Sequence, residues 1–219
     1  METLRSRWLT DVDALGADVG RDALLAEATD LLDRWLEDHR SYHDAVHLAE
    51  VLAALDELSD EGELPGRDRH LAGLAAWFHD AVYDAGVAAG ANEEASAQLA
   101  EDHLGRLGLK EEDIARVAQL VRESATHEMS TDDPATKAFH DADLWILAAP
   151  AERFDAYCHQ VRLEYRQVRA ADYARGRIAV LTPFATRDRL YLTDHAHEHW
   201  TGRARVNLAR EIDRLAAPA

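Results

Sequence analysis

The sequence predicts an all-α fold, on three observations. Only 11 glycines and 5 prolines interrupt its 219 residues, so long stretches are free of helix breakers. Ala and Leu, both strong helix formers, dominate the composition, whereas the β-branched residue Ile occurs only four times. Apolar residues recur at spacings of three and four through most of the chain, and we find no convincing period-two alternation. We therefore expect a single-domain helical bundle over residues 1–219, without a linker or an internal repeat.

Five helices are expected in the first half of the chain. The second has a regular apolar stripe that includes Leu24, Leu31 and Trp35. The acidic segment 59–67 contains Gly and Pro, which separate the third helix from the fourth. Asn92 suits the N-cap of the fifth helix, because its side-chain oxygen can accept from a free first-turn amide. The expected ranges are about 3–15, 21–38, 43–58, a fourth helix that reaches 82, and 92–108.

Five more helices are expected in the second half. Pro134 and Pro150 each suit a first helical turn, where a missing amide proton costs nothing. The expected ranges are about 111–125, 134–147, 150–168, 172–186 and 196–215. Trp8, Trp35 and Trp200 could form an interface between copies of the chain if they are exposed, so a homo-oligomer is an open expectation.

The charge of the chain restricts its partners. Lys and Arg number 24 against 42 Asp and Glu, which leaves a net charge of −18. Such a surface repels nucleic-acid backbones and anionic membranes, because binding either depends on Lys and Arg. No window approaches the roughly 18 uncharged residues of a membrane span. We expect a soluble, cytoplasmic protein that neither coats nucleic acid nor enters a membrane. Cys158 is the only cysteine, which excludes an intrachain disulfide and a thiolate zinc cage.

Histidines and aspartates interrupt three apolar segments in a defined order. His47, the adjacent pair His79 and Asp80, and Asp143 would bring two imidazoles and two carboxylates from three helices. This mixture suits a divalent ion such as Mn, Fe, Co, Ni or Zn, with Mg also open, better than an all-oxygen calcium cage. Each pair alone has an ordinary alternative, such as a buried histidine bonded to a carbonyl. The complete order is the stronger signal.

Six ordered motifs extend this pattern from Arg40 to Ile212: RSYHDAVH, WFHDAVYD, NEEASA, FHDADLWIL, VRLEY and ARVNLAREI. Together they resemble the HD-domain superfamily of metal-dependent phosphohydrolases, in particular its small bacterial branch. The resemblance implies an all-helical HD-type fold and hydrolysis of a small phosphorylated substrate, such as a nucleotide, by a metal-activated water. It implies that His47, His79, Asp80 and Asp143 bind the metal ion.

The resemblance also suggests catalytic residues. The superfamily takes its name from the adjacent His-Asp pair, here His79 and Asp80, which we call the HD doublet. Many members have a glutamate three residues after this doublet, where this chain has Tyr83, so Asp84 is our candidate for the general base. Metal-bound Asp80 is an alternative proton acceptor. His43 and His127 could neutralise phosphate charge or protonate a leaving oxygen, although capping or supporting hydrogen bonds would explain them equally well.

Further residues are candidates for substrate binding. Arg40 and Arg162 could supply the local positive charge that a phosphate needs, and Tyr42 could line the pocket edge. Asn92 and Ser96 could approach the substrate at a helix N-terminus.

Two other functions remain open. A di-iron HD-type oxygenase would need extra ligands between the doublet and the last aspartate, where only His103 and His127 are available. A metal-stabilised binding or regulatory module would use the ion only to fasten helices together, and a closed coordination sphere would favour it.

Overall fold

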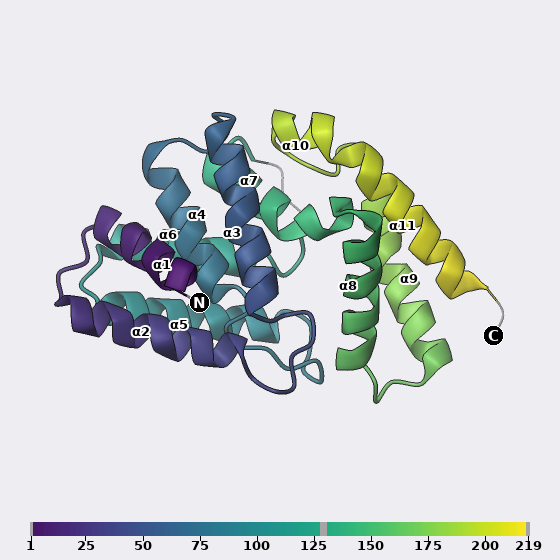
Figure 1. Cartoon of the computed structure of the whole chain (residues 1–219), viewed down its shortest axis with the longest axis horizontal. Coiled ribbons are helices and arrows are strands. Elements are labelled where there is room, and N and C mark those ends of the chain that lie inside the picture. Colours follow the sequence, from purple (N-terminus) through teal and green to yellow (C-terminus); the bar gives the residue numbers. More distant parts are fainter. Residues whose placement is uncertain (1, 128–130, 218–219) are drawn as a thin grey trace.

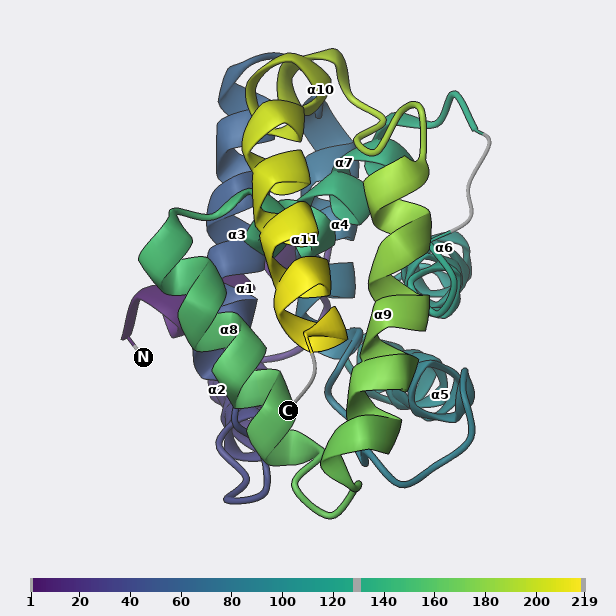
Figure 2. The same ribbon diagram turned by 90° about the vertical axis from the view of Figure 1, so that its right-hand side faces the viewer.

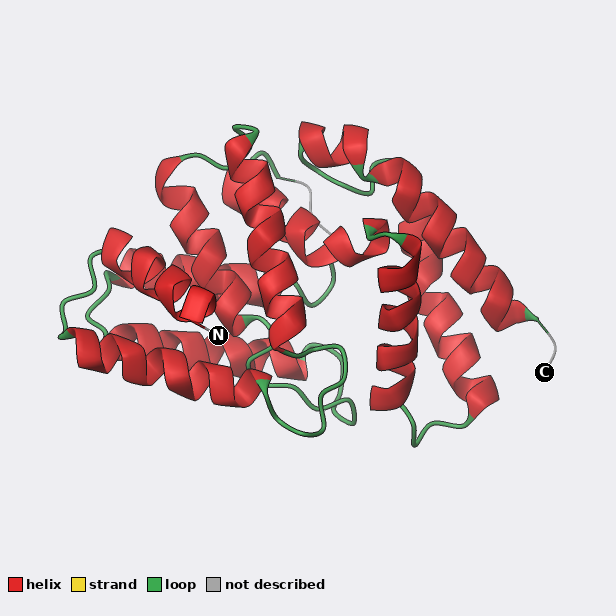
Figure 3. Cartoon of the chain, viewed as in Figure 1, coloured by secondary structure: helices red, strands yellow, loops and turns green. Residues whose placement is uncertain are grey.

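The computed structural model describes residues 2–127 and 131–217, and the regular elements within these ranges are all helices (Figure 3). The predicted all-α class is therefore confirmed for the described part of the chain. The helices are α1 (Glu2–Ala14), α2 (Arg21–Trp35), α3 (Ala45–Asp60), α4 (Gly66–Phe78), α5 (Ala91–Arg106), α6 (Glu111–Glu123), α7 (Pro134–Asp143), the 3-10 helix η1 (Leu144–Ala148), α8 (Ala151–Glu164), α9 (Ala170–Thr186), α10 (Asp194–His199) and α11 (Thr201–Ala216). None of the described helices is both long and apolar enough to cross a membrane.

The helices form two groups that α7 and η1 connect (Figure 1). Helix α4 packs against α1, α3, α6 and α7, whereas α11 packs against α9 and η1. One cluster of buried apolar side chains includes residues from α1 to α11. The end of α4 therefore lies inside the molecule, where residues from both groups can reach it.

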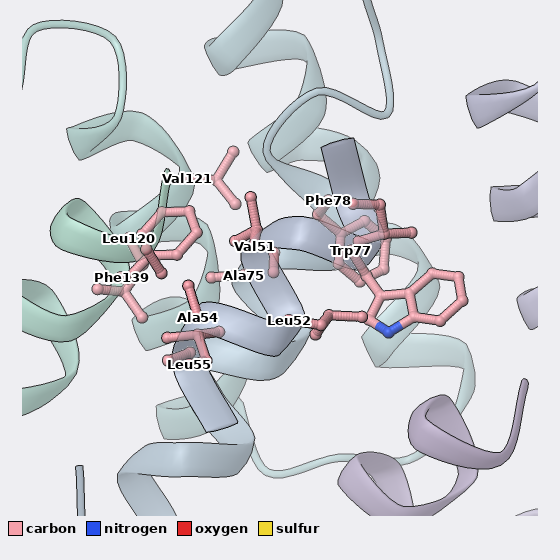
Figure 4. Close-up of a cluster of buried hydrophobic side chains, with 14 of the residues drawn as sticks. Val51, Leu52, Ala54, Leu55, Ala75, Trp77, Phe78, Leu120, Val121 and Phe139 are labelled. Atoms are coloured by element: carbon pink, nitrogen blue, oxygen red, sulfur yellow. The ribbon is translucent and has the colours of Figure 1, made fainter. Parts of the chain in front are cut away.

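The core around α4 is built from large side chains. Figure 4 shows Trp77 and Phe78 of α4 beside Leu52 of α3. The indole of Trp35 donates to the Trp77 carbonyl at 2.9 Å, which ties α2 to the last turn of α4. Trp8, Trp35 and Trp200 are all at most 2% exposed. The exposure on which an interface of these tryptophans depended is therefore absent, because all three side chains are buried.

Helix α1 approaches α4 closely enough to require a glycine. A Cβ atom at Gly73 would lie 2.6 Å from Oδ2 of Asp11. That carboxylate is buried and bonds to Arg7 and His70, so it cannot move aside cheaply. Gly73 thus fixes the distance between α1 and the helix that leads to the HD doublet.

Several helix ends differ from the expected ones, and two of them matter for the site. Helix α4 ends at Phe78 instead of 82, so His79 is its C-cap and Asp80 lies in the following turn. Helix α3 begins at Ala45, because the Asp44 side chain caps it by accepting from the Val46 amide at 2.8 Å. His43 therefore precedes the helix and does not share a helical face with His47. The expected last helix divides at Trp200 into α10 and α11.

Candidate metal centre

The HD doublet and His47 meet in space although 32 residues separate the two histidines. The Nε2 atoms of His47 and His79 lie 3.2 Å apart. Oδ2 of Asp80 lies 3.1 Å from His79 Nε2 and 3.6 Å from His47 Nε2. The ligand atoms of these three residues all fall within 4.8 Å of one another, a spacing that can hold a metal ion.

Asp143, the last residue of α7, completes the predicted set. Its Oδ1 lies 3.3 Å from His47 Nε2 and 3.4 Å from His79 Nε2. Asp141 points elsewhere, because its carboxylate accepts from the backbone amides of Leu192 and Thr193 at 2.7 and 2.8 Å. The structure thus brings His47, His79, Asp80 and Asp143 together, and we call these four residues the tetrad.

Hydrogen bonds on the far side of each imidazole prepare the histidines to bind a cation. His79 donates its Nδ1–H to the Ala76 carbonyl at 2.9 Å, which leaves the Nε2 lone pair facing the tetrad. His47 Nδ1 lies 3.1 Å from the Tyr42 hydroxyl, and donation to that oxygen leaves its Nε2 free as well. Two nitrogen and two carboxylate donors fit a borderline divalent ion.

The charges of the tetrad also suit a cation. Burial lowers the pKa of His79, but the carboxylates of Asp80 and Asp143 outweigh this effect and raise it well above the ordinary value. Burial raises the pKa of each carboxyl group, yet His79 holds the pKa of both well below the usual range. Both aspartates are therefore ionised, and they offer two negative charges to an ion that displaces the proton of the imidazole.

The tetrad opens onto a cavity of about 380 Å³. The lining of this cavity also contains Arg177, from α9, and Arg187, which follows that helix. Arg187 donates to the His127 carbonyl at 2.7 Å, and Arg177 donates to the Tyr157 hydroxyl. Within residues 2–127 and 131–217, neither guanidinium forms an ion pair with a carboxylate. Two cations without an ion-pair partner among these residues therefore line the same cavity as the tetrad.

Sequence reasoning missed both arginines, although a signal was present. The residues three and four positions away from Arg177 and from Arg187 include no Asp or Glu. Their neighbour Arg175, by contrast, pairs with Asp172 at 2.5 Å on the helix surface. An arginine without an acidic partner at these spacings is free to serve a site.

Glu164, at the end of α8, holds the chain segment before α3. Its Oε1 accepts from the amides of Ser41, Tyr42 and His43 at 2.8, 2.7 and 3.0 Å. Its Oε2 accepts from the Tyr83 hydroxyl at 2.9 Å. Burial raises the pKa of Glu164, but these donors and the His43 imidazole outweigh it and lower the pKa to about 2.

His43 is oriented by the same carboxylate. Its Nδ1 lies 2.7 Å from Oε2 of Glu164, and its ring stacks on Tyr83 with centroids 4.1 Å apart. Burial lowers the pKa of His43, whereas Asp80 and Glu164 raise it, with a net increase. His43 lines the cavity, so the structure supports its predicted place at the site.

His127 also lines the cavity, from the segment after α6. Its backbone has a φ of 50°, a left-handed conformation that few non-glycine residues adopt. This conformation brings Nε2 to 3.5 Å from Oδ2 of Asp143. Burial lowers the pKa of the His127 imidazole.

The structure places Asp84 away from the tetrad, in contrast to its predicted role as the general base. Its side chain is exposed and accepts from the Gly86 amide at 2.7 Å, which closes a turn. The expectation assumed that the helix continued beyond the doublet and returned Asp84 to the same face as Asp80. Because α4 ends at Phe78, that periodicity does not apply.

Asn92 and Ser96 bind the loop after the doublet instead of the cavity edge. The Asn92 amide accepts from the backbone N–H of Asp84 and donates to its carbonyl, both at 3.1 Å. The Ser96 hydroxyl accepts from the N–H of Val82 at 3.1 Å and donates to its carbonyl at 3.3 Å. Gly90 takes the N-cap position expected for Asn92.

The two arginines predicted to bind substrate also have structural partners. Arg40 is 7% exposed and donates to the carbonyls of His43, Asp80 and Ala81 at 2.9, 2.6 and 3.1 Å. Arg162 donates to backbone carbonyls that follow α8. Both lie outside the cavity lining, whereas Tyr42 belongs to it, as predicted.

Of the two histidines that a di-iron site would need, the structure brings one to the tetrad. His103 lies between α5 and α2, where it pairs with Glu27. His127 is the histidine that borders the cavity.

Comparison of the chain with protein-family models and with curated proteins finds no match. The resemblance to the HD-domain superfamily therefore stays a prediction from the sequence.

Proposed function

We propose that this protein is a divalent-metal-dependent phosphohydrolase of the HD type that acts on small phosphoesters. The observation that carries the proposal is one cavity lined both by the tetrad and by two arginines that pair with no carboxylate among the described residues. Although the net charge of the chain is −18, these two arginines attract anions to the cavity that they line. A phosphate group in this cavity can bind a metal ion at the tetrad and accept hydrogen bonds from both guanidinium groups.

The tetrad and the two arginines have separate roles in the proposed reaction. The tetrad would hold the ion, which would supply an activated water and polarise a phosphoryl oxygen. Arg177 and Arg187 bind the remaining phosphoryl oxygens and stabilise the charge that develops on them. Their planar groups can each donate two parallel hydrogen bonds, which also fixes the orientation of the phosphate.

Two histidines are placed for proton transfer. Glu164 accepts from Nδ1 of His43, so the Nε2 of this ring is available to protonate a leaving oxygen. His127 Nε2, at 3.5 Å from Asp143, can accept a proton from the attacking water. His127, which lines the cavity, therefore replaces Asp84 as our candidate for the general base.

The cavity also favours a catalytic over a purely structural role for the ion. A purely structural ion is enclosed by its ligands, whereas the tetrad borders a cavity of about 380 Å³. Water and a substrate could reach the tetrad through this space.

The experiment is a hydrolysis assay on protein loaded with Mn, Fe, Co, Ni, Zn or Mg, with a panel of phosphomonoesters, phosphodiesters and nucleotides. We expect turnover that a chelator abolishes and that His79→Ala removes. Arg187→Gln should lower kcat/KM by about 100-fold or more, whereas Arg162→Gln, at a cationic residue outside the cavity, should leave it unchanged. Metal retention without any turnover that depends on His79 would refute the proposal and favour a binding module.

A further inference from the structure

A second cavity, of about 450 Å³, adjoins the metal pocket. Residues of α8, of the turn that follows it and of α9 line this cavity. Figure 2 shows that α8 and α9 diverge from the turn that joins them, with α11 between them in this view. The proposed chemistry at the tetrad uses none of this space.

The two cavities are adjacent. They share five lining residues, which are Tyr42, His43, Tyr157, Arg177 and Val180. Arg177, proposed above to bind the phosphate, therefore stands at the junction. A phosphoester whose phosphate lies between the tetrad and Arg177 would extend its organic group into the second cavity.

The lining of the second cavity selects the chemistry of that group. Beyond the junction its walls are mostly tyrosine rings and valines, among them Tyr165, Tyr173, Val161 and Val168. At the junction, the rings of Tyr42 and Tyr157 pack edge to face with centroids 4.5 Å apart. Such walls favour a flat, weakly polar group, although Asp172 and Arg177 also belong to the lining.

The rim of the cavity is apolar as well. Val180 is 52% exposed and Val168 is 37% exposed, although both are large apolar residues. An apolar group seated between them would remove this surface from water.

A glycine keeps the cavity open. Gly176 lies within α9 and lines the second cavity, and a Cβ atom there would meet none of the described atoms within 4 Å. Glycine is unfavourable inside a helix relative to alanine, and the neighbouring atoms of the fold do not require it here. Space for a ligand is a physical reason for its presence.

We propose that this second cavity binds an aromatic or similarly flat, apolar group of the substrate, so that the preferred substrates are phosphoesters of such groups. The inference rests on the proposed phosphohydrolase function, because that function places the phosphate beside Arg177.

The test compares 1-naphthyl phosphate with glycerol 2-phosphate as substrates of the metal-loaded protein. We expect kcat/KM to favour the naphthyl ester, and Gly176→Leu to lower the ratio of the two values about 10- to 100-fold by filling the cavity. Gly202→Leu, at an exposed helical glycine with equally open surroundings, should leave the ratio unchanged. A ratio that Gly176→Leu does not alter, in protein with an unchanged helical circular dichroism spectrum, would overturn the proposal. Gly176→Met serves as a second, more flexible filling variant.

Calorimetry separates failure of this inference from failure of the proposed function. If wild-type protein hydrolyses neither ester, the hydrolase proposal fails, and binding decides the inference. The cavity proposal then expects 1-naphthyl phosphate to bind at least about tenfold more tightly than inorganic phosphate, and Gly176→Leu to abolish the difference. Equal affinities for the two ligands in wild-type protein would overturn it.

Discussion

Glu164 provides the most direct test of how the site is supported. Its carboxylate accepts five hydrogen bonds from residues 41–43 and 83, so Glu164→Gln removes the charge while it keeps the shape of the side chain. The pKa of Glu164 falls from 4.5 to about 2 in the folded protein. A decrease of roughly 2.5 units corresponds to about 3 kcal/mol of stability, at 1.36 kcal/mol per unit.

The pH dependence of this contribution has a defined sign. Because the pKa of Glu164 is lowered by folding, its stabilising effect is complete above pH 4.5 and disappears as the pH falls toward 2. At pH 7 we expect Glu164→Gln to lower the free energy of unfolding by about 3 kcal/mol, or the Tm by roughly 6–12 °C for a chain of this size. Near pH 2.5 the difference between the variant and the wild type should shrink to below about 1 kcal/mol.

Urea titrations followed by helical circular dichroism measure both differences. Glu152→Gln, at an exposed glutamate of the same helix, is the matched control and should change the free energy of unfolding by less than about 0.5 kcal/mol. The reasoning is refuted if Glu164→Gln is as mild as this control at pH 7. It is also refuted if the loss of stability is the same at both pH values.

Three further substitutions test the hydrogen bonds that hold the turn after α4, which contains Asp80, and the position of the general base. Arg40→Lys should lower the free energy of unfolding by about 2 kcal/mol in urea titrations, because an ammonium cannot donate to three separated carbonyls as the guanidinium does; an unchanged midpoint would contradict this. Ser96→Ala should cost about 1–2 kcal/mol and speed hydrogen exchange at the Val82 amide, which loses its acceptor; unaltered exchange would count against the assignment. Asp84→Asn should retain hydrolysis within about twofold, since its carboxylate is exposed outside the cavity; a hundredfold loss of kcat would restore Asp84 as the base.

The tetrad could be predicted from the sequence, because the order of its four residues along the chain can be read without knowledge of the fold. His47, His79, Asp80 and Asp143 lie near the ends of three helices whose periodicity was readable from local spacing. The end of α4 was not readable, because the partners that hold the turn are distant in the chain. Arg40 binds the carbonyl of Asp80 across 40 residues. Ser96 holds Val82 from another helix.

The roles of charged residues were harder to predict than the ligands. Arg40 and Glu164 look like surface residues in the sequence, and their burial depends on contacts between distant helices. Arg162 was chosen for its charge, which it uses on the carbonyls after its own helix. Arg177 and Arg187 have no acidic residue three or four positions away, which made them better candidates in the sequence. Only the fold, however, places them in the same cavity lining as the tetrad.

Metal binding by purified protein tests the central claim most directly. Isothermal calorimetry with elemental analysis should find one divalent ion per chain at the tetrad, and His79→Ala and Asp143→Asn should each weaken binding by more than about 100-fold. His159→Ala, at an exposed histidine of α8, should bind the ion as the wild type does. Failure of wild-type protein to retain any divalent ion, or equal affinity in all four proteins, would contradict the account.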